Sequence, residues 1–325
     1  MLAAAPVLSF AVALVALWLL VARLARFGLD RPNERSLHER PVPRTGGIAI
    51  VAGAAVSLAF GADTLWLPLG AAAALAALSF ADDLAGLPTL VRLCAHLAAA
   101  GLVAWYVLSP MAPAELLVIA LAIAWLTNLY NFMDGSDGLA GGMAVVGFGS
   151  YALAAWLCAD VPLATASGCI AGASAAFLLY NFHPARIFLG DVGSIPLGFL
   201  AGGLGIVGWR DDVWPFWFPL LVFAPFVGDA TLTLLRRAAR RERVWQAHRD
   251  HYYQRLVRMG FGHRGTACIS YAAMLACAAV ALAAREQRGA VQAAAFGGAC
   301  LALAAAAVWV DLRWKRHLRT AGASA

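Results

Sequence analysis

The chain has 325 residues, of which 62% are hydrophobic and only 13% are charged, whereas roughly a quarter of the residues in soluble domains are charged. A soluble globule of this length could not cover so much apolar surface, because folded domains leave many of their residues in contact with water. The composition also excludes a disordered chain, a coiled coil and a disulfide-stapled secreted module. The class that remains is an all-α, polytopic membrane helical bundle.

The apolar residues fall into stretches of the length that a membrane helix needs, about 20 residues. The first stretch has no charge and is followed by arginines, so we expect a retained span with its N-terminus outside rather than a cleaved signal peptide. The sequence predicts eleven spans in a single domain over residues 1–325, with the approximate limits 1–22, 46–62, 65–81, 90–109, 114–132, 139–158, 162–181, 192–209, 213–235, 267–284 and 290–312. Eleven crossings place the C-terminus inside.

The basic residues test this topology. The net charge is +6, and in a soluble protein such an excess would suggest nucleic acid. Here the segments expected inside hold all but three of the 24 lysines and arginines, the exceptions being Arg210, Arg285 and Arg288. This bias agrees with the positive-inside rule. We therefore expect no nucleic-acid partner, and a cytoplasmic loop rich in arginine and histidine at 236–266.

Ionisable side chains gather on the expected inner side. Such groups are costly at membrane depth and usually serve function, although a single aspartate often only marks a helix end at the interface. The acidic members of this set are Asp82, Asp83, Asp134, Asp137, Asp191 and Asp229. The histidines are His38, His96, His183, His248, His251, His263 and His317. Four clusters recurring on one face favour a functional site over a set of interface markers.

The first cluster is the aspartate pair Asp82-Asp83, directly after the third predicted span. Adjacent carboxylates repel each other, which raises the pKa of one of them or recruits a cation. Binding of a divalent ion such as Mg²⁺, or proton transfer, is the natural use of such a pair.

The second cluster is N-L-Y-N-F-M-D-G-S-D-G, from Asn128 to Gly138. Asn128 and Asn131 are three residues apart and share a helix face. Asp134 and Asp137 follow, each before a glycine that lets the backbone turn tightly beside a ligand. Asp-Gly pairs alone are ordinary turn signals, but paired asparagines before them favour a site for a metal, a nucleobase edge or a sugar.

The third cluster spans Tyr180 to Ser194. Pro184 ends the seventh predicted span, and Arg186 offers a two-point donor for phosphate. Asp191 opens the eighth span within G-D-V-G. A carboxylate in that position suits Mg²⁺ bridging a diphosphate, and the alternative is an aspartate that only caps the helix.

The fourth cluster is H-R-D-H-Y-Y-Q within the 236–266 loop. His248 and His251 would share one face if this stretch were helical, and the surrounding arginines indicate an anion site. Two alternatives remain open at this point. The arginines could attract anionic lipid headgroups, or the histidines could bind zinc, for which no third ligand is evident nearby.

Taken together and in this order, the four clusters resemble those of the polyprenyl-phosphate N-acetylhexosamine-1-phosphate transferases, also called glycosyl transferase family four. The match runs from S-L-H-E-R-P-V-P-R-T-G-G (residues 36–47) through Gln254. The resemblance implies that polyprenyl (undecaprenyl) phosphate attacks the β-phosphate of a UDP-N-acetylhexosamine and releases UMP. It also implies a site on the cytoplasmic face of the bacterial plasma membrane and Mg²⁺, or alternatively Mn²⁺, as the cofactor. A homodimer is compatible with it.

The family's roles carry over to matching positions of this sequence. The residues that the resemblance implies as catalytic are Asp82, Asp83, Asp134, His248 and His251. Those it implies as metal ligands are Asp191, the principal one, and Asn131. Asn128, Asp137, Asn181 and Phe188 match positions that line the uridine pocket. Arg92 and Arg186 complete the expected substrate-binding set as partners of phosphate.

Two departures bear on the substrate. Arg92 stands where many members carry lysine, and H-R-D-H-Y-Y-Q replaces a compact histidine triplet. Both resemble the branch that initiates O-antigen or capsule chains, often with 6-deoxy amino sugars. The phospho-N-acetylmuramoyl-pentapeptide transferases of peptidoglycan synthesis are the alternative within the family.

Two alternatives lie outside the family. D-G-S-D-G-L-A (134–140) partly matches the motif of CDP-alcohol phosphotransferases, but the Ala-Arg that should follow and two further aspartates are missing. A transporter or lipid flippase would carry its charges through the bilayer rather than on one face.

Overall fold

The computed structural model describes residues 4–23, 29–30, 41–244, 246 and 248–322. The part of the 36–47 motif before residue 41, with His38, lies outside the described residues. The helices in chain order are α1 (Ala4–Arg23), α2 (Gly46–Ala55), α3 (Trp66–Ala85), α4 (Thr89–Leu108), α5 (Pro113–Phe132), α6 (Leu139–Leu157), α7 (Val161–Asn181), α8 (Asp191–Arg210), α9 (Trp217–Val222), α10 (Ala224–Ala239), α11 (Tyr252–Leu256), α12 (Gly262–Ala284) and α13 (Gly289–Gly322). Short 3-10 helices at Val56–Phe60 and Asp63–Leu65, a π-helical turn at Val257–Phe261, and the strands β1 (Leu29–Asp30) and β2 (Val42–Pro43) complete the described elements.

The predicted fold class is confirmed, because the described residues form a helical bundle in which nine helices are long and apolar enough to cross a membrane. The sequence predicts eleven spans, which is more than the nine such helices found among the described residues. The stretch at 46–62 is α2, of 10 residues, followed by a 3-10 helix of 5 residues. At about 1.5 Å per α-helical residue and about 2.0 Å per 3-10 residue, the two helices together span about 25 Å, which is short of a hydrocarbon core of about 30 Å.

The stretch at 213–235 also differs from the predicted span. It is divided at Phe223 into α9 and α10. Pro225 lies in the first turn of α10 and has no amide hydrogen to continue the hydrogen-bond ladder of α9. Composition alone does not reveal this break, since both halves are apolar.

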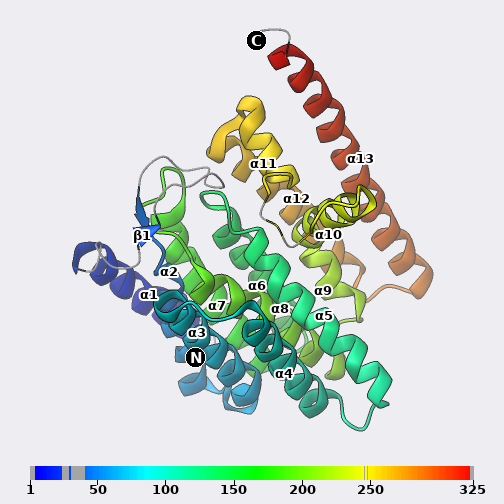
Figure 1. The fold of residues 1–325 in the computed structure, drawn as a ribbon. Coiled ribbons are helices and arrows are strands. Elements are labelled where there is room, and N and C mark those ends of the chain that lie inside the picture. Colours follow the sequence, from blue (N-terminus) through cyan, green and yellow to red (C-terminus); the bar gives the residue numbers. More distant parts are fainter. Residues whose placement is uncertain (1–3, 24–28, 31–40, 245, 247, 323–325) are drawn as a thin grey trace.

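Helix α8 is the centre of the bundle. It packs against α2, α3, α4 and α5, and 89% of its apolar window is buried. Small residues allow this close approach: a Cβ built on Gly198 would lie 2.6 Å from the carbonyl oxygen of Leu126 in α5. Figure 1 shows α8 behind α5 and α6, whereas α13 extends away from the bundle. The first residue of α8, Asp191, therefore lies beside the end of α5.

The stretch at 236–266 is only partly a loop. Helix α10 continues to Ala239, and α11 with its π-helical turn leads into α12 at Gly262. His248 and His251 precede α11 instead of lying on a helix, so the condition for a shared helical face is not met. The turn before α11 nevertheless brings the two histidine rings close together.

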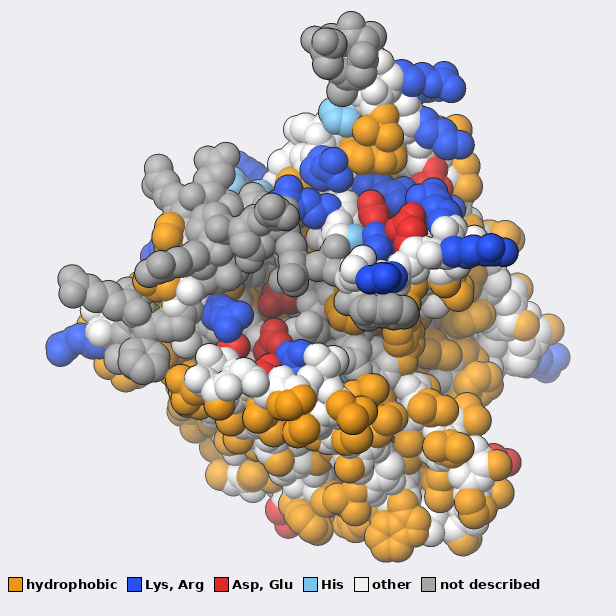
Figure 2. Space-filling view, viewed as in Figure 1, with side chains coloured by type: hydrophobic (Ala, Val, Ile, Leu, Met, Phe, Trp, Pro, Cys, Tyr) orange, Lys and Arg blue, Asp and Glu red, His pale blue; other side chains and the backbone are white. Residues whose placement is uncertain are grey.

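Charged side chains are unequally distributed over the molecule. In the view of Figure 2, the lower part of the surface is mostly hydrophobic. Acidic and basic side chains gather above it, in a hollow beside α3 and α4 and over α10 and α11. The predicted clusters lie on this charged side.

Candidate active site

A backbone clasp joins the R-T-G-G segment to the loop between α7 and α8. The amides of Gly46 and Gly47 donate to the carbonyls of Phe188 and Leu189, both at 2.9 Å, and the Phe188 amide donates to Pro43 at 2.7 Å. A Cβ on Gly47 would lie 2.2 Å from the Gly193 nitrogen. The two glycine-rich motifs therefore touch directly, which fixes the N-terminal segment beside the start of α8.

The aspartate pair lies in the last turn of α3, and each carboxylate meets an arginine. Arg92 Nη1 of α4 donates to Asp82 Oδ2 at 2.8 Å, and the Leu87 amide donates to Asp82 Oδ1 at 2.6 Å. Arg44 Nη2 donates to Asp83 Oδ1 at 2.6 Å. The expected repulsion between adjacent carboxylates is thus relieved by cations from two different segments.

The end of α5 contacts the start of α8 through side chains. Asn131 Nδ2 donates to Asp191 Oδ1 at 2.9 Å and to Ser194 Oγ at 2.8 Å. Asp191 is the first residue of α8, its N-cap is Gly190, and no side-chain cap hydrogen bond is made there. The alternative of a capping aspartate is therefore wrong, and the carboxylate is held by a neighbouring helix.

The loop between α5 and α6 is braced by the α7–α8 segment. Asp137 Oδ2 accepts from His183 Nδ1 at 2.7 Å and from the Ala185 amide at 3.1 Å. Asn181 accepts from the Gly138 amide and donates to the Ile187 carbonyl, each at 2.9 Å. Both Asp137 and Asn181 are buried. In this structure the two side chains hold loops together, a role that the sequence did not indicate.

His263, at the start of α12, also reaches this loop. Its Nδ1 accepts from the Asp137 amide at 3.3 Å and lies 2.9 Å from Ser136 Oγ. Because an amide donates to Nδ1, the ring proton of neutral His263 is on Nε2. The ring stacks on His183, with centroids 5.4 Å apart. The sequence predicts His263 on the inner side but indicates no role for it, because no local pattern links residues so far apart in the chain.

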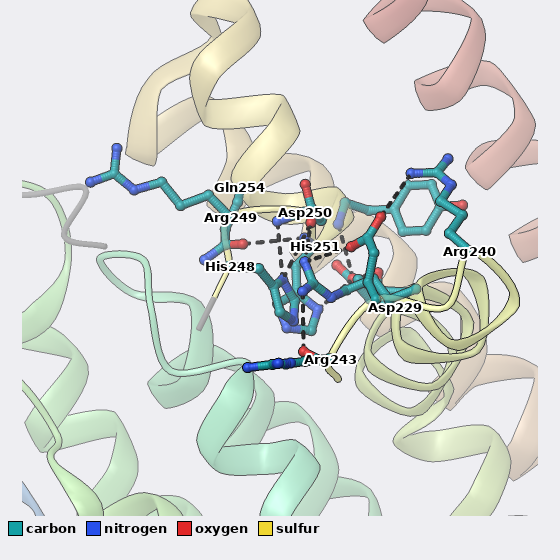
Figure 3. A network of polar contacts seen from close by, with 12 residues as sticks. Asp229, Arg240, Arg243, His248, Arg249, Asp250, His251 and Gln254 are labelled. Atoms are coloured by element: carbon teal, nitrogen blue, oxygen red, sulfur yellow. Dashed lines mark hydrogen bonds and ion pairs between the residues drawn. The ribbon is translucent and has the colours of Figure 1, made fainter. Parts of the chain in front are cut away.

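The histidine segment is held by Asp229 of α10 (Figure 3). Asp229 accepts from the Tyr252 amide at 2.9 Å and the Tyr253 amide at 3.0 Å, and its Oδ1 lies 3.2 Å from His251 Nδ1. Gln254 Oε1 accepts from the His251 amide at 3.2 Å. Asp229 thus satisfies two amides at the start of α11 that have no helical partner and orients the His251 ring.

Tyr253 links the histidine segment to the loop after α5. Its hydroxyl donates to the Phe132 carbonyl at 3.2 Å, and its ring stacks on His251 with centroids 5.7 Å apart. A Cβ on Gly135 would lie 2.1 Å from the Tyr253 hydroxyl. Gly135 is therefore needed for the approach of this tyrosine, and the second and fourth clusters are brought together.

If His251 is catalytic, as the resemblance implies, Asp229→Asn is expected to reduce turnover about 10- to 100-fold, because small displacements of a catalytic group are costly. The new amide group would also face the Tyr252 and Tyr253 amides. Steady-state kinetics of the purified protein measure this effect. The control is Asp212→Asn, which changes an exposed aspartate at the far end of α8. Equal turnover of Asp229→Asn and wild type would contradict the positioning of His251 by Asp229.

His248 is the neighbour of His251, with ring centroids 4.8 Å apart. Burial, with His251 and Arg237 nearby, lowers the pKa of His248 from 6.5 to about 4. The Asp250 amide donates to its Nδ1 at 3.3 Å. The imidazole is therefore neutral at pH 7.

This lowered pKa predicts acid lability. The unfolded chain binds the His248 proton more tightly than the folded chain, so stability is complete above about pH 6.5 and is lost as the pH falls toward about 4. The free energy of unfolding should fall by up to about 3 kcal/mol from this group. Thermal unfolding in detergent at several pH values measures it, and His248→Asn should flatten the curve. An unchanged pH dependence in that variant would contradict the assignment.

The remaining predicted site residues are placed less closely together. Asn128 of α5 donates to the Ala124 carbonyl at 2.7 Å. Phe188 and Asp134 are half-buried in the loops described above. Arg186 is exposed, lies over the Tyr180 ring at 4.3 Å and donates to the Leu179 carbonyl at 3.1 Å. It therefore caps the end of α7 instead of contacting the aspartates.

The residues present fit a magnesium ion better than zinc. Among the described residues, no three Cys, His, Asp or Glu side chains are grouped as a metal cage, and zinc usually takes four such ligands. Mg²⁺ is bound by one or two carboxylates with waters and substrate phosphates. Asp191 supplies a carboxylate and Ser194 a neutral hydroxyl oxygen, and Asn131 turns its amide nitrogen toward both.

Fold and site together define an integral membrane protein with an acidic site, bordered by arginines, on one face of the bundle. The family model described as "Glycosyl transferase family 4" matches residues 65–209 of this chain. A decaprenyl-phosphate N-acetylglucosaminephosphotransferase of Mycobacterium tuberculosis (strain CDC 1551 / Oshkosh) is 31% identical over 295 residues, covering 74% of this chain and 71% of that protein. The chain belongs to glycosyl transferase family 4.

Two further relatives differ in extent. The "Probable undecaprenyl-phosphate N-acetylglucosaminyl 1-phosphate transferase" of Bacillus subtilis (strain 168) is 28% identical over 289 residues, which cover 82% of this chain and 81% of that protein. A phospho-N-acetylmuramoyl-pentapeptide-transferase of Bacillus pumilus (strain SAFR-032) is 44% identical, but over only 72 residues and 22% of each chain. Similarity to the N-acetylglucosamine enzymes is thus much more extensive.

Proposed function

We propose that the protein transfers N-acetylglucosamine 1-phosphate from UDP-N-acetylglucosamine to a polyprenyl phosphate and releases UMP. The observation that carries this proposal is the similarity over most of the chain to proteins named for that reaction. The charged site is in keeping with it, because a nucleotide sugar and a lipid phosphate need cations and a metal on one membrane face. The O-antigen branch and 6-deoxy amino sugars remain a prediction that only donor specificity will test.

The peptidoglycan alternative has weaker support. The two phospho-N-acetylmuramoyl-pentapeptide-transferases compared with this chain match 22% and 26% of it, whereas the N-acetylglucosamine relatives cover 74–82%. A transporter is disfavoured by family membership and by the concentration of charge on one side of the bundle.

In the proposed reaction, a phosphate oxygen of the lipid forms a bond to the β-phosphorus of UDP-N-acetylglucosamine. The bond from that phosphorus to the oxygen bridging to the α-phosphate breaks, and the electron pair leaves with UMP. Phosphoryl transfer mainly requires positioning and neutralisation of charge. Bound Mg²⁺ would supply the neutralisation of the diphosphate, held by Asp191 with Asn131.

The protein's own groups supply the rest of the proposed chemistry. Arg92 lies beside Asp82 and attracts phosphate. A carboxylate of the aspartate pair accepts the proton of the lipid phosphate when that phosphate is protonated. His251, oriented by Asp229, and neutral His248 close the diphosphate site. Asp134 is proposed as a further catalytic aspartate, and Phe188 is proposed to contact the uridine.

We also propose that the site faces the cytoplasm of a bacterium, where nucleotide sugars are made, with the protein in the plasma membrane. The concentration of arginines in segments on the charged side supports this orientation.

The test is to incubate the purified protein with polyprenyl phosphate, Mg²⁺ and a panel of UDP-amino sugars. UMP should form with UDP-N-acetylglucosamine only when the lipid phosphate is present, and EDTA should stop it. Absence of UMP with every donor in the panel would overturn the proposal.

A further inference from the structure

Arg44 faces the aspartate pair from the N-terminal segment, and no motif in the sequence gave it a role. We propose that Arg44 is a second binding residue for the phosphate of polyprenyl phosphate, and that it moves from Asp83 to this phosphate when the lipid arrives. The inference rests on the proposed function for the identity of the lipid. Its chemistry is the recognition of an isoprenoid phosphate monoester.

The backbone of Arg44 is fixed next to the proposed metal ligand. Its flanking residues form the clasp with Phe188 and Leu189. Gly190 has a φ of +70°, which favours glycine, and a Cβ there would lie 2.2 Å from the Arg44 carbonyl oxygen. Arg44 therefore borders both the start of α8, at Asp191, and the end of α3, at Asp83.

Each carboxylate of the aspartate pair is in contact with an arginine. Asp82 is paired with Arg92 and Asp83 with Arg44. Two arginines thus neutralise the two adjacent carboxylates, which would otherwise repel each other. A phosphate monoester carries between one and two negative charges near pH 7. When the phosphate arrives, its negative charge offers an arginine a new partner. The arginine could then leave its carboxylate and bind the phosphate.

The contact of Arg44 with Asp83 is suited to exchange. The Arg44 side chain is 40% exposed, and exposed ion pairs are worth only about 0–1 kcal/mol. The contact joins one nitrogen of Arg44, Nη2, to one oxygen of Asp83. Arg210, at the other end of the bundle, instead meets Asp211 with two nitrogens and two oxygens. A phosphate can give Arg44 the two-point contact that Asp83 does not provide.

Arg92 is the more fixed of the two arginines. Its side chain is 36% exposed, close to the 40% of Arg44, but it makes one more contact, because its Nη2 also donates to Thr89 at 3.3 Å in its own helix turn. Movement of Arg44 alone would take one arginine from Asp83 as the lipid binds, while Asp82 keeps its contact with Arg92.

The first test separates the two substrates kinetically. In Arg44→Gln, the KM for polyprenyl phosphate should rise about 10- to 100-fold, while the KM for the UDP-sugar stays within about twofold, because a lost charge-assisted phosphate contact affects only its own ligand. Arg44→Lys should recover part of the loss. The matched control is Arg210→Gln, which removes an arginine from another exposed ion pair and should change neither KM.

A rise in both KM values together, or an unchanged KM for the lipid, would overturn the assignment. The first result would indicate a purely structural ion pair or a contact with the nucleotide diphosphate instead. Thermal unfolding distinguishes a structural ion pair from a contact with the nucleotide diphosphate. Only a structural role would lower the unfolding temperature of Arg44→Gln well below that of Arg210→Gln.

A binding experiment keeps the test independent of turnover. Calorimetric titration in detergent compares farnesyl phosphate with uncharged farnesol. Wild type should prefer the phosphate, and Arg44→Gln should lose at least about tenfold of that preference. Equal preference in both proteins would contradict a role for Arg44 in phosphate binding. If wild type binds farnesyl phosphate but releases no UMP, the proposed reaction fails while the Arg44 assignment holds.

Discussion

Asp191→Asn should abolish turnover, with a loss of at least about 1,000-fold, while the protein remains folded. The substitution keeps the shape of the side chain and its hydrogen-bonding capacity toward Asn131, which donates to it at 2.9 Å. It removes the negative charge that a Mg²⁺ ion needs from its ligands. Losing one stabilising group aimed at a charged transition state typically costs 100- to 1,000-fold, and loss of the metal removes more than one such contact.

The measurement compares turnover and unfolding temperature in Asp191→Asn and Asp212→Asn. Asp212 is exposed and lies just beyond the other end of α8, so its variant should match wild type in both respects. Addition of Mg²⁺ should raise the unfolding temperature of wild type and have no such effect on Asp191→Asn. Near-normal turnover of Asp191→Asn would remove Asp191 from the metal site.

Gly47→Ala is expected to disturb the structure of the site strongly. The added carbon would lie 2.2 Å from the Gly193 nitrogen and 2.3 Å from its Cα, where only backbone could yield. Overpacking of this kind costs about 3 kcal/mol at the upper end of its usual range. The clasp would open, and Asp191, Arg44 and the start of α8 would move with it.

Unfolding temperature and turnover should both fall in Gly47→Ala, the former by several degrees. The matched control is Gly101→Ala in α4, where a Cβ would meet nothing within 4 Å. That variant should be as stable as wild type or slightly more so, because alanine favours the helix. A Gly47→Ala protein with normal stability and turnover would contradict the close contact between the two glycine motifs.

The sequence was informative about the helices and about the chemical types of the site residues. The end of α5 with Asn128 and Asn131, and the opening of α8 by Asp191, follow the prediction. The number of full-length spans was overestimated because a break such as that at Phe223 leaves the hydrophobicity unchanged. Membrane helices are apolar on all sides, so periodicity carries little information about which face is buried.

The contacts that build the site could not be predicted, because they join residues distant in the chain. Nothing local pairs Arg44 with Asp83, or Asp229 with His251. The uridine-pocket roles that the resemblance implies for Asp137 and Asn181 stay predictions, and the contacts by which their side chains brace loops could not be foreseen. Glycine was the most useful missed signal: Gly47, Gly135 and Gly193 mark three of the closest approaches between motifs.

The central claim is that a sugar 1-phosphate, rather than a sugar, is transferred to the lipid. It is tested most directly with UDP-N-acetylglucosamine labelled in the β-phosphate, incubated with the purified protein, polyprenyl phosphate and Mg²⁺. The account predicts that the label moves into the lipid fraction in equal amount to the UMP released. Release of labelled UDP, or a lipid product without the label, would contradict it.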